Sequence, residues 1–251
     1  RVLAINRELL AQLLADGSLP DLLRPEAISA VHEELQHTAE ATRARTREEL
    51  AYLFQELGDL TAEEVTARAG AEGPKWLLEL AAQGRLVEID LPAGPGTARR
   101  WVPVERLPRY RQAFGLPEVG ELPPAAAPLA EETPEDARRA LLQLALRTRG
   151  PQTLGEIAAR YGFPRGWLEE ALQALADEGV AVRGYLTPGA LEPQWCDRAV
   201  LERIHRRTLS ILRHEIEPVS LPALADFSVR WQGLHPAEKR SGREGLTLAL
   251  Q

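Results

Sequence analysis

Hydrophobic residues recur at intervals of three and four along most of the chain, which is the spacing of amphipathic helices. Over 46–84 this pattern predicts three consecutive helices. Two short segments with alternating apolar residues follow, joined by the Gly/Pro-rich turn "PAGPGTA". The order helix, helix, helix, strand, turn, strand predicts a winged helix whose wing is the turn. A generic α+β unit is the alternative.

The same order returns over 134–197, and the two halves match in sequence. "GDLTAEEVTARAG" (58–70) matches "GPQTLGEIAARYG" (150–162) at a constant offset of 92. "LLELAAQGRLVEIDL" (77–91) matches "LQALADEGVAVRGYL" (172–186) at an offset of 95. Matches in one order with little drift predict a tandem duplication. Two units are too few for a solenoid, which needs roughly three or more repeats.

The second helix of each unit carries matching boundary signals. Thr61 and Thr153 each precede the helix, and Glu64 and Glu156 follow them by three residues. This spacing is typical of a capping box, in which the two side chains satisfy the first backbone N–H groups. A glycine closes each of these helices.

Further helices flank the repeats, so we expect a mainly α protein with small β-wings: tandem winged-helix units plus flanking helices. Helical patterns cover 4–17, 25–41, 197–216 and 221–233. The expected domains are the N-terminal helices and first winged-helix unit over 1–114, a Pro/Ala/Glu-rich linker or strap over 115–134, and, over 135–251, the second unit, the basic helix 197–216 and the start of a further segment.

The amino-acid composition indicates the cellular compartment and suggests that the chain is part of a longer one. The single cysteine, Cys196, excludes an internal disulfide framework and suits a reducing compartment. No apolar run approaches the ~20 residues of a membrane span, so we expect a cytoplasmic protein with no membrane partner. The sequence has no methionine, so Arg1 is not a natural start and we expect a fragment of a longer chain.

Positive charge gathers in two places although the chain has a net charge of −7. Five arginines lie within 99–111 and five within 197–214, each time after the wing of a repeat. Guanidinium groups bind phosphate oxygens in two-pronged fashion, which favours contact with a nucleic-acid backbone. The alternative is that these arginines pair with acidic helices and hold the units together. The residues predicted to bind DNA are Arg99, Arg100, Arg111, Lys75, Arg165, Arg203, Arg206, Arg207 and Arg213.

The third helix of each unit, the usual recognition element of a winged helix, gives a mixed signal. Each begins with a cation and a tryptophan, Lys75 with Trp76 and Arg165 with Trp167. Several acidic residues lie along the same helices and would repel a major groove. We therefore expect the tryptophans to pack internally rather than to contact bases.

No catalytic constellation stands out in the sequence. The phosphate-binding motif GxxxxGK[ST] and the zinc motif HExxH are absent, and so are Cys/His metal sets. We expect His32 and His37 to lie on a solvated helix face, and Cys196 to be a buried structural thiol. We thus predict no catalytic residue, no metal site and no ATP site in this chain.

The run "QWCDRAVLERIHRRTLSILRHEIEPVSLPALADFSVRWQGL" (194–234) resembles the C-terminal region of bacterial large helicase-related proteins, which are superfamily 2 DNA helicases. "RYRQAFGLP" (109–117) and "RTRGPQTLGEIAARYGF" (147–163) fit as well. The resemblance implies tandem winged helices, with ATP and Mg bound by a helicase core that this chain lacks. It also implies DNA and the helicase core of the same polypeptide as partners. Self-association is a further partner hypothesis, which accompanies the scaffold alternative.

The same region of these proteins is similar to winged-helix DNA glycosylases, which rely on a Gln-x-Asp motif. Here Gln232 is followed two positions later by Leu234, so that motif is not matched. Three hypotheses remain open: a non-catalytic DNA-binding and assembly module of a DNA repair helicase, part of a glycosylase acting on damaged bases, and a protein-interaction scaffold.

Overall fold

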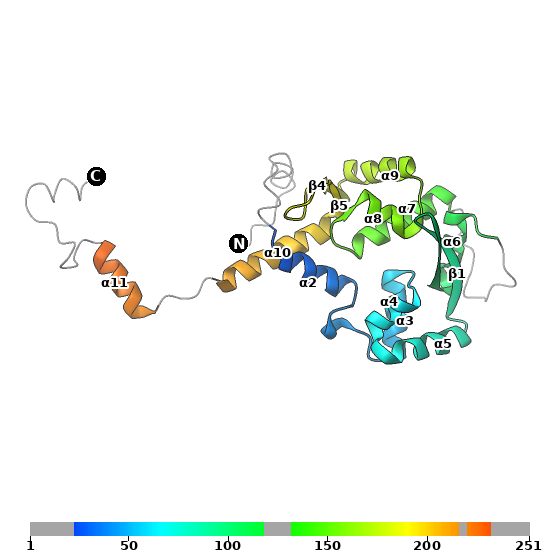
Figure 1. Ribbon diagram of the computed structural model, residues 1–251, viewed down its shortest axis with the longest axis horizontal. Coiled ribbons are helices and arrows are strands. Elements are labelled where there is room, and N and C mark those ends of the chain that lie inside the picture. Colours follow the sequence, from blue (N-terminus) through cyan, green and yellow to red (C-terminus); the bar gives the residue numbers. More distant parts are fainter. Residues whose placement is uncertain (1–22, 118–131, 216–219, 232–251) are drawn as a thin grey trace, which may run out of the picture. The chain divides into compact units, whose positions relative to one another are not determined.

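A computed structural model describes residues 23–117, 132–215 and 220–231 (Figure 1). These residues fall into two units, one ending at Leu209 and the other starting at Ser210, and each is described by itself. Three sequence-based predictions lie wholly or largely outside the described residues, namely the helix over 4–17, the linker over 115–134 and the segment after 231.

The first winged helix has the predicted element order. Its strands form an antiparallel pair in which Leu86 lies opposite Pro103 and Ala93 opposite Gly96. Leu60 adds a single bridge to Trp101. The elements are α3 (Arg47–Leu57), α4 (Ala62–Ala69), α5 (Gly73–Ala82), β1 (Leu86–Ala93) and β2 (Gly96–Pro103), followed by α6 (Leu107–Phe114).

The second winged helix repeats this plan. Gln152 pairs with Trp195 as Leu60 pairs with Trp101, so the matched residues occupy equivalent positions in the two sheets. The three-stranded sheet has the order β3-β5-β4. The elements are α7 (Pro134–Arg147), β3 (Gln152–Thr153), α8 (Leu154–Tyr161), α9 (Arg165–Asp177), β4 (Ala181–Gly184) and β5 (Gln194–Asp197).

Both predicted capping boxes are present. The Thr61 hydroxyl accepts the N–H of Glu64 at 3.2 Å, and the Glu64 carboxylate accepts the N–H of Thr61 at 2.9 Å. The corresponding distances between Thr153 and Glu156 are 3.2 and 2.7 Å. These bonds satisfy two of the four free N–H groups at each helix start, which is why the helices begin at the same point of each repeat.

One hydrophobic core spans both winged helices, and the first winged helix has a second core of its own around Leu50, Phe54 and Leu80. Leu91, Val102 and Tyr110 of the first unit belong to the same buried cluster as Leu142 and Tyr161 of the second. The first wing also docks on the second unit, because the N–H of Gly94 donates to the carbonyl of Ala159 at 2.9 Å. The two units are therefore held together by burial as well as by the chain connection.

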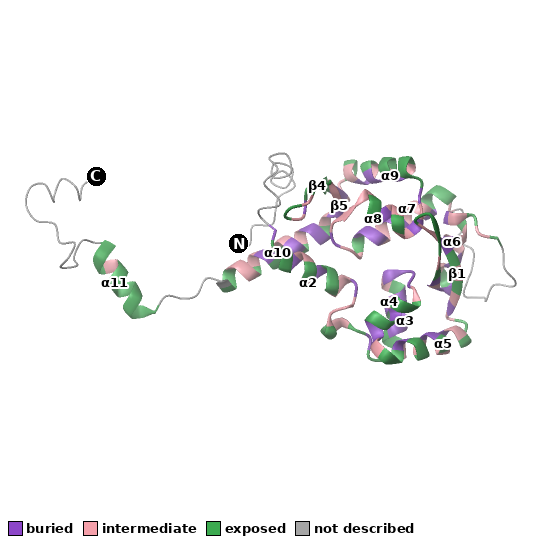
Figure 2. Cartoon of the chain, in the orientation of Figure 1, coloured by how far each residue is buried: buried purple, intermediate pink, exposed green. Residues whose placement is uncertain are grey.

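Three helices flank the repeats: α2 (Pro25–Leu35), α10 (Arg198–Glu215) and α11 (Leu221–Trp231). They match the predicted helices over 25–41, 197–216 and 221–233, with α2 ending earlier than its pattern suggested. None of the residues of α11 is buried (Figure 2). The mainly α fold with small wings is confirmed. Among the described helices, none combines the length and apolarity that crossing a membrane would require.

Candidate nucleic-acid interface

The arginine-rich helix α10 has one buried and one exposed face. Asp197 begins it, because its carboxylate accepts the N–H groups of Ala199 at 2.8 Å and Val200 at 3.3 Å. Apolar residues spaced three and four apart are buried, and arginines fill many of the remaining positions. The start of the helix is held to the second winged helix, because Arg198 Nε donates to the carbonyl of Gly179 at 2.7 Å. The buried residues are Val200, Leu201, Ile204 and Thr208, and the exposed ones include Arg203, Arg206 and Arg207.

The exposed arginines Arg203, Arg206 and Arg207 form one edge of α10, and Glu34 of α2 partly neutralises it. Arg203 Nη2 lies 2.6 Å from Glu34 Oε2, and Arg207 Nη1 lies 3.9 Å from Glu34 Oε1. Arg206 is exposed and forms no ion pair with the residues that the structure describes. Arg213 is also exposed, and it lies on the part of α10 after Leu209, which is described by itself. Arg206 thus keeps its charge available, while Arg203 and Arg207 share one carboxylate.

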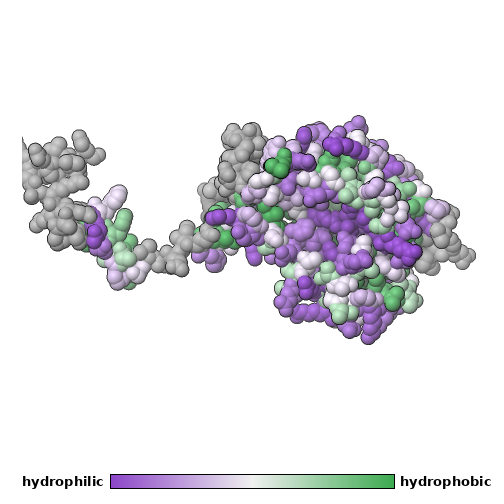
Figure 3. Space-filling view, in the orientation of Figure 1, coloured by the Kyte–Doolittle hydropathy of each residue, from purple (hydrophilic) through white to green (hydrophobic). Residues whose placement is uncertain are grey.

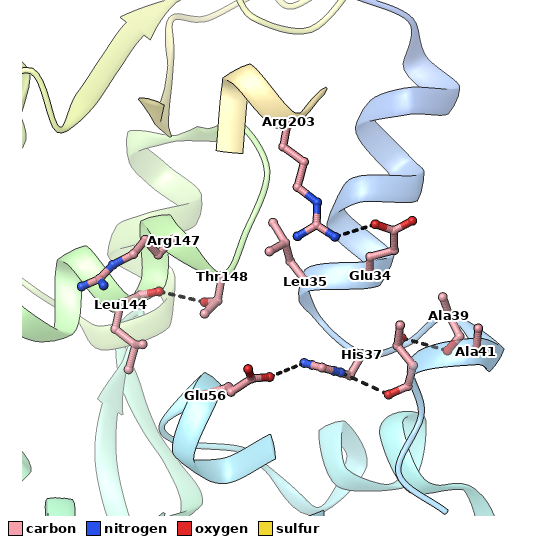
Figure 4. Close-up of a pocket in the computed structure, with 11 residues that line it drawn as sticks. Glu34, Leu35, His37, Ala39, Ala41, Glu56, Leu144, Arg147, Thr148 and Arg203 are labelled. Atoms are coloured by element: carbon pink, nitrogen blue, oxygen red, sulfur yellow. Dashed lines mark hydrogen bonds and ion pairs between the residues drawn. The ribbon is translucent and has the colours of Figure 1, made fainter. Parts of the chain in front are cut away.

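A pocket of about 580 Å³ opens between α2, α3, α7 and α10 (Figure 4). Arg203 reaches toward Glu34 on one side of it, and Arg147, which is exposed, comes from α7. On another side, His37 Nε2 lies 2.7 Å from Glu56 Oε2. The pocket therefore carries both signs of charge, and two of its charged groups, Arg203 and Glu34, already form an ion pair.

The prediction of a solvated helix face holds for His32, which is exposed on α2, and is wrong for His37, which lies after the helix and is partly buried. His37 stands just after α2 with φ of 53°, and its Nδ1 lies 3.1 Å from the carbonyl of Thr42. His32 Nδ1 accepts the N–H of Gly150 at 3.3 Å. His32 thus contacts the segment after α7 while it remains exposed, and His37 joins the turn after α2 to Thr42 and Glu56.

Arg100, expected at the DNA, is instead buried inside the protein. Its side chain is 5% exposed, and its Nη1 lies 2.6 Å from Oδ2 of the fully buried Asp59. Its Nη2 donates to the carbonyl of Arg160 at 2.5 Å. Arg100 cannot reach a nucleic acid from this position, and the alternative of internal pairing holds for it.

Asp59 gathers groups from both winged helices. Arg160 of α8 adds a second ion pair to its carboxylate at 2.8 Å. The hydroxyls of Tyr110 and Tyr161 donate to the other carboxylate oxygen at 2.9 and 2.7 Å. Burial opposes ionisation, but Arg160 and Arg100 outweigh it and lower the pKa of Asp59 to about 2. Burial and the charge of Asp59 raise the pKa of Tyr161 to about 12, so both tyrosines remain hydrogen-bond donors.

The other residues of the first winged helix that were predicted to bind DNA are Arg99, Lys75 and Arg111. They are exposed or half-buried, and each lies near carboxylates. The exposed Arg99 is 4.0 Å from Glu88 and 3.9 Å from Asp90 on the neighbouring strand. Lys75 is 3.8 Å from Glu72. Arg111 is half-buried on α6 and lines a pocket of about 360 Å³ together with Glu88 and Asp90. No contact in the described residues brings these cations together with α10.

The start of the second recognition helix resembles the first. Arg165 is exposed, and its Nε lies 3.0 Å from Glu169 Oε1. Trp76 and Trp167 both pack against hydrophobic cores, as the sequence predicted, and Trp167 contacts Phe163 edge-on. Their helices therefore contribute aromatic surface to the cores, and α9 presents acidic residues to solvent.

The two wings differ in exposure. The first wing docks on α8, whereas the second carries Leu191, which is 93% exposed, and the exposed Tyr185. Figure 3 shows hydrophilic residues over most of the visible face of the unit that ends at Leu209. Only the short strand β5 separates the second wing from α10 in the chain.

Sequence reasoning missed the groups around Asp59 and the cation Arg147. One signal was available, because Arg68 and Arg160 occupy matching positions in the two repeats. Both are internal: Arg68 is 4% exposed and donates to the carbonyl of Glu64 and to Gln36. A repeated arginine in the last turn of a short capped helix indicated a shared structural role.

The described residues offer little to a catalytic mechanism. No group of three or more His, Cys, Asp or Glu side chains in this part of the chain could hold a metal ion. Cys196 is fully buried, and burial raises the pKa of its thiol, so it is a poor nucleophile, as predicted. Exposed arginines on rigid helices suit binding of a phosphate backbone better than chemistry.

Comparisons with known proteins agree with this geometry. Residues 21–131 match the family described as large helicase-related protein, winged-helix domain. The chain is similar to a protein of Mycolicibacterium smegmatis named Lhr helicase/probable uracil glycosylase, with 32% identity over 99% of this chain and 16% of that protein. It is also similar to the Lhr helicase/uracil glycosylase of Escherichia coli, with 28% identity over 94% of this chain and 15% of that protein. The chain thus spans about one sixth of the length of these relatives.

Proposed function

Because the chain belongs to the large helicase-related proteins, we propose that it is a non-catalytic DNA-binding and assembly module of an ATP-dependent DNA repair helicase. The module contacts the nucleic-acid backbone through arginines and adds no chemistry of its own. In this proposal ATP and Mg are bound by a helicase core elsewhere in the same polypeptide, and that core is a second partner of the module.

The observation that carries the proposal is the exposed edge of α10. Arg206 has no ion pair among the described residues, and Arg203 and Arg207 share the single carboxylate of Glu34. The helix is anchored by its buried face, so these guanidinium groups are presented from a rigid element. Phosphate is the anion that fits such an edge best.

The proposed contact is to the backbone rather than to bases. The recognition helices place Lys75 and Arg165 beside Glu72 and Glu169, and acidic residues continue along α9. Base readout needs side chains that enter a groove, and a helix rich in carboxylates is repelled there. Backbone contacts carry no sequence information, so we expect sequence-independent binding that weakens steeply with salt.

The test is fluorescence anisotropy with labelled single-stranded and duplex DNA, starting at about 50 mM salt and rising to about 200 mM. The double variant Arg206→Ala/Arg207→Ala is expected to bind more weakly and to reduce the salt slope by about 0.9 for each duplex phosphate that the protein no longer neutralises. The matched control is Arg139→Ala, which removes an arginine that is paired with Glu178 at the surface of α7 and is not among the predicted DNA contacts. Absence of binding at the lowest salt, or a double variant with unchanged slope, contradicts the proposal.

A second variant separates DNA contact from internal pairing. Glu34→Gln removes the carboxylate that Arg203 and Arg207 share. If these arginines bind phosphate, both gain charge available to DNA and affinity rises. If their role is to fasten α2 to α10, Glu34→Gln leaves DNA affinity unchanged and lowers the melting temperature.

Part of a DNA glycosylase is the second candidate function, because the names of both relatives include uracil glycosylase. A base-release assay on uracil-containing and alkylated DNA tests it. We expect no release by this chain, since the sequence does not match the Gln-x-Asp motif at Gln232. Release of uracil that survives removal of contaminating enzymes would replace the non-catalytic proposal.

An interaction scaffold is the third candidate, and α11 favours it. Leu221, Phe227 and Trp231 are exposed there, and Phe227 stacks on Trp231 with ring centroids 5.9 Å apart. Analytical ultracentrifugation of the chain and of Phe227→Ala/Trp231→Ala tests self-association. A shift toward smaller species in the variant would support it, and identical sedimentation would count against it.

A further inference from the structure

Four arginines meet two carboxylates where the winged helices join. Arg68 and Arg100 are buried, and the side chains of Arg149 and Arg160 are only 14% and 13% exposed. Within the described residues, the carboxylates within ion-pair distance of these arginines belong to Asp59 and Glu64. Removing charge from water is costly unless an opposite charge compensates it. The junction therefore holds two positive charges in excess.

Arg149 is only weakly compensated by a carboxylate. Its Nη2 lies 3.9 Å from Glu64 Oε1, the oxygen that Arg160 Nη1 already contacts at 2.9 Å. Burial, followed by repulsion from Arg160, lowers the pKa of Arg149 to about 10. Asp59 and Glu64 are mainly engaged with Arg160 and Arg100, so Arg149 lacks a close anion of its own.

A pocket of about 400 Å³ opens at this point. It is lined by Arg149 and Arg160, and also by His32, Gln152 and Glu156. The volume exceeds by several-fold the roughly 30 Å³ share of one water molecule, so a tetrahedral oxyanion with part of its hydration shell fits. The excess positive charge thus borders a space that is open to a ligand.

The polar groups of the pocket suit an oxyanion. His32 Nδ1 accepts the N–H of Gly150, so the neutral ring carries its proton on Nε2 and can donate from there. Burial, then Arg149 and Arg68, lowers the pKa of His32, which keeps the ring neutral until an anion arrives. Glu156 is the one carboxylate of the lining; it is exposed, and its Oε2 accepts hydrogen bonds from the backbone and hydroxyl of Thr153.

We propose that this pocket binds a phosphate group, with Arg149 as its principal charged partner and His32 as a neutral donor. The group is either a backbone phosphate of a nucleic acid or free inorganic phosphate, since both present the same oxyanion. The free-phosphate form is independent of the proposed function, and the nucleic-acid form extends it with a second contact on α7–α8, separate from the edge of α10.

The first experiment measures thermal unfolding of the chain in inorganic phosphate and in chloride at equal ionic strength. The melting temperature is expected to rise with phosphate concentration in the native sequence and to stay constant in Arg149→Gln. The control is Arg139→Gln, an arginine paired with Glu178 at the surface of α7, which should keep the phosphate response.

A structural role for Arg149 gives the opposite result in chloride. If the proposal is right, Arg149→Gln unfolds in chloride at the same or a higher temperature, because it removes a nearly buried charge that lacks a close partner. A lower melting temperature in chloride, together with no phosphate response of the native chain, would make Arg149 a structural partner of Glu64 and overturn the proposal.

The second experiment distinguishes the two sources of phosphate. Anisotropy of labelled DNA is measured with and without inorganic phosphate at constant ionic strength, for the native chain and Arg149→Gln. Competition by phosphate, with roughly tenfold weaker binding by the variant, indicates a backbone phosphate. Phosphate stabilisation without competition indicates the free ion, and both results support the site.

An NMR titration of the His32 ring adds a readout that needs no DNA. Phosphate is expected to raise the pKa of His32 in the native chain and to leave it unchanged in Arg149→Gln. If phosphate changes neither the melting temperature nor this pKa, and Arg149→Gln binds DNA normally, the site does not exist. That outcome is distinct from failure of the α10 interface, which is judged by Arg206→Ala/Arg207→Ala.

Discussion

Replacing Asp59 with asparagine removes the negative charge that joins the two winged helices. The carboxylate lies within 2.6 to 2.9 Å of Arg100, Arg160, Tyr110 and Tyr161, and its side chain is 0% exposed. Asparagine has nearly the same size as aspartate and keeps one acceptor oxygen. Its NH2 group, however, is a donor and cannot accept hydrogen bonds from the guanidinium groups. The substitution therefore leaves two nearly buried cations without their main partner.

The loss in free energy of unfolding that Asp59→Asn should cause can be worked out in two ways. The pKa of Asp59 falls from 3.8 to about 2, and this shift corresponds to about 2.5 kcal/mol of stability in the ionised state. Removing one member of a buried ion pair costs about 3–5 kcal/mol, because the remaining charge stays buried. We expect Asp59→Asn to lower the free energy of unfolding by about 3–5 kcal/mol, a large part of the stability of an ordinary domain.

Urea denaturation at neutral pH, followed by circular dichroism and tryptophan fluorescence, measures this free energy. The matched control is Asp90→Asn, because Asp90 is an exposed aspartate 3.9 Å from Arg99 in the same unit. Its effect should stay within about 0.5 kcal/mol, as is usual for surface pairs. A loss below about 1 kcal/mol in Asp59→Asn would refute the view that the buried carboxylate compensates the arginines.

Three further predictions follow from the same contacts. Because folding lowers the pKa of Asp59, its contribution to stability is present above pH 3.8 and is lost as the pH falls toward about 2. The free energy of unfolding, measured from neutral pH down to this range, should therefore fall less steeply in Asp59→Asn than in the native chain. Gly162→Ala should lower the free energy of unfolding, measured by urea denaturation, more than Gly84→Ala does. Both glycines have positive φ, 59° and 69°, but the Cβ added at Gly162 would lie about 2.9 Å from Pro92 Cβ, whereas the one at Gly84 meets open space. Equal losses would mean that the first wing is not tightly docked. Cys196 should react with a thiol reagent only on unfolding, and rapid labelling of the folded chain would contradict its burial.

The helices and caps could be predicted because their signals are local. The Thr61 and Thr153 capping boxes need only a threonine, a glutamate and three residues of spacing. The bridges of Trp101 and Trp195 to the residues before those threonines confirm that the matched sequences build the same unit twice.

The role of Arg100 could not be assigned from charge alone. Successive residues of a strand point to opposite faces, so Arg99 and Arg100 must differ in exposure. Arg100 shares its face with Val102, which is 0% exposed, and Arg99 lies on the other face. Strand parity therefore indicated which arginine turns inward, whereas counting arginines over 99–111 treated both alike.

The partner of Arg100 was beyond the reach of local patterns. Asp59 precedes α4 of the first winged helix, and Arg160, which shares the carboxylate with Arg100, lies in the last turn of α8 of the second, 101 residues away in the chain. Nothing in either segment specifies the other, because the contact depends on how the wing, α6 and α8 close around a shared core. The same reason hid the excess charge at Arg149, which becomes evident only when four arginines are brought to one place.

The segments that follow the two wings differ in exposure, and the proposed DNA contact lies with the second of them. In the first unit, the wing docks on Ala159 and the basic segment after it sends Arg100 to Asp59, so both elements hold the two units together. In the second unit, the wing keeps Leu191 exposed, and the helix after it keeps Arg206 exposed. Because the first copy supplies the internal ion pairs, the second copy can present the same kind of segment to solvent. The arginines that follow the two wings should therefore respond differently to mutation: Arg100→Ala should lower the free energy of unfolding, measured by urea denaturation, and Arg206→Ala should weaken DNA binding without changing that free energy.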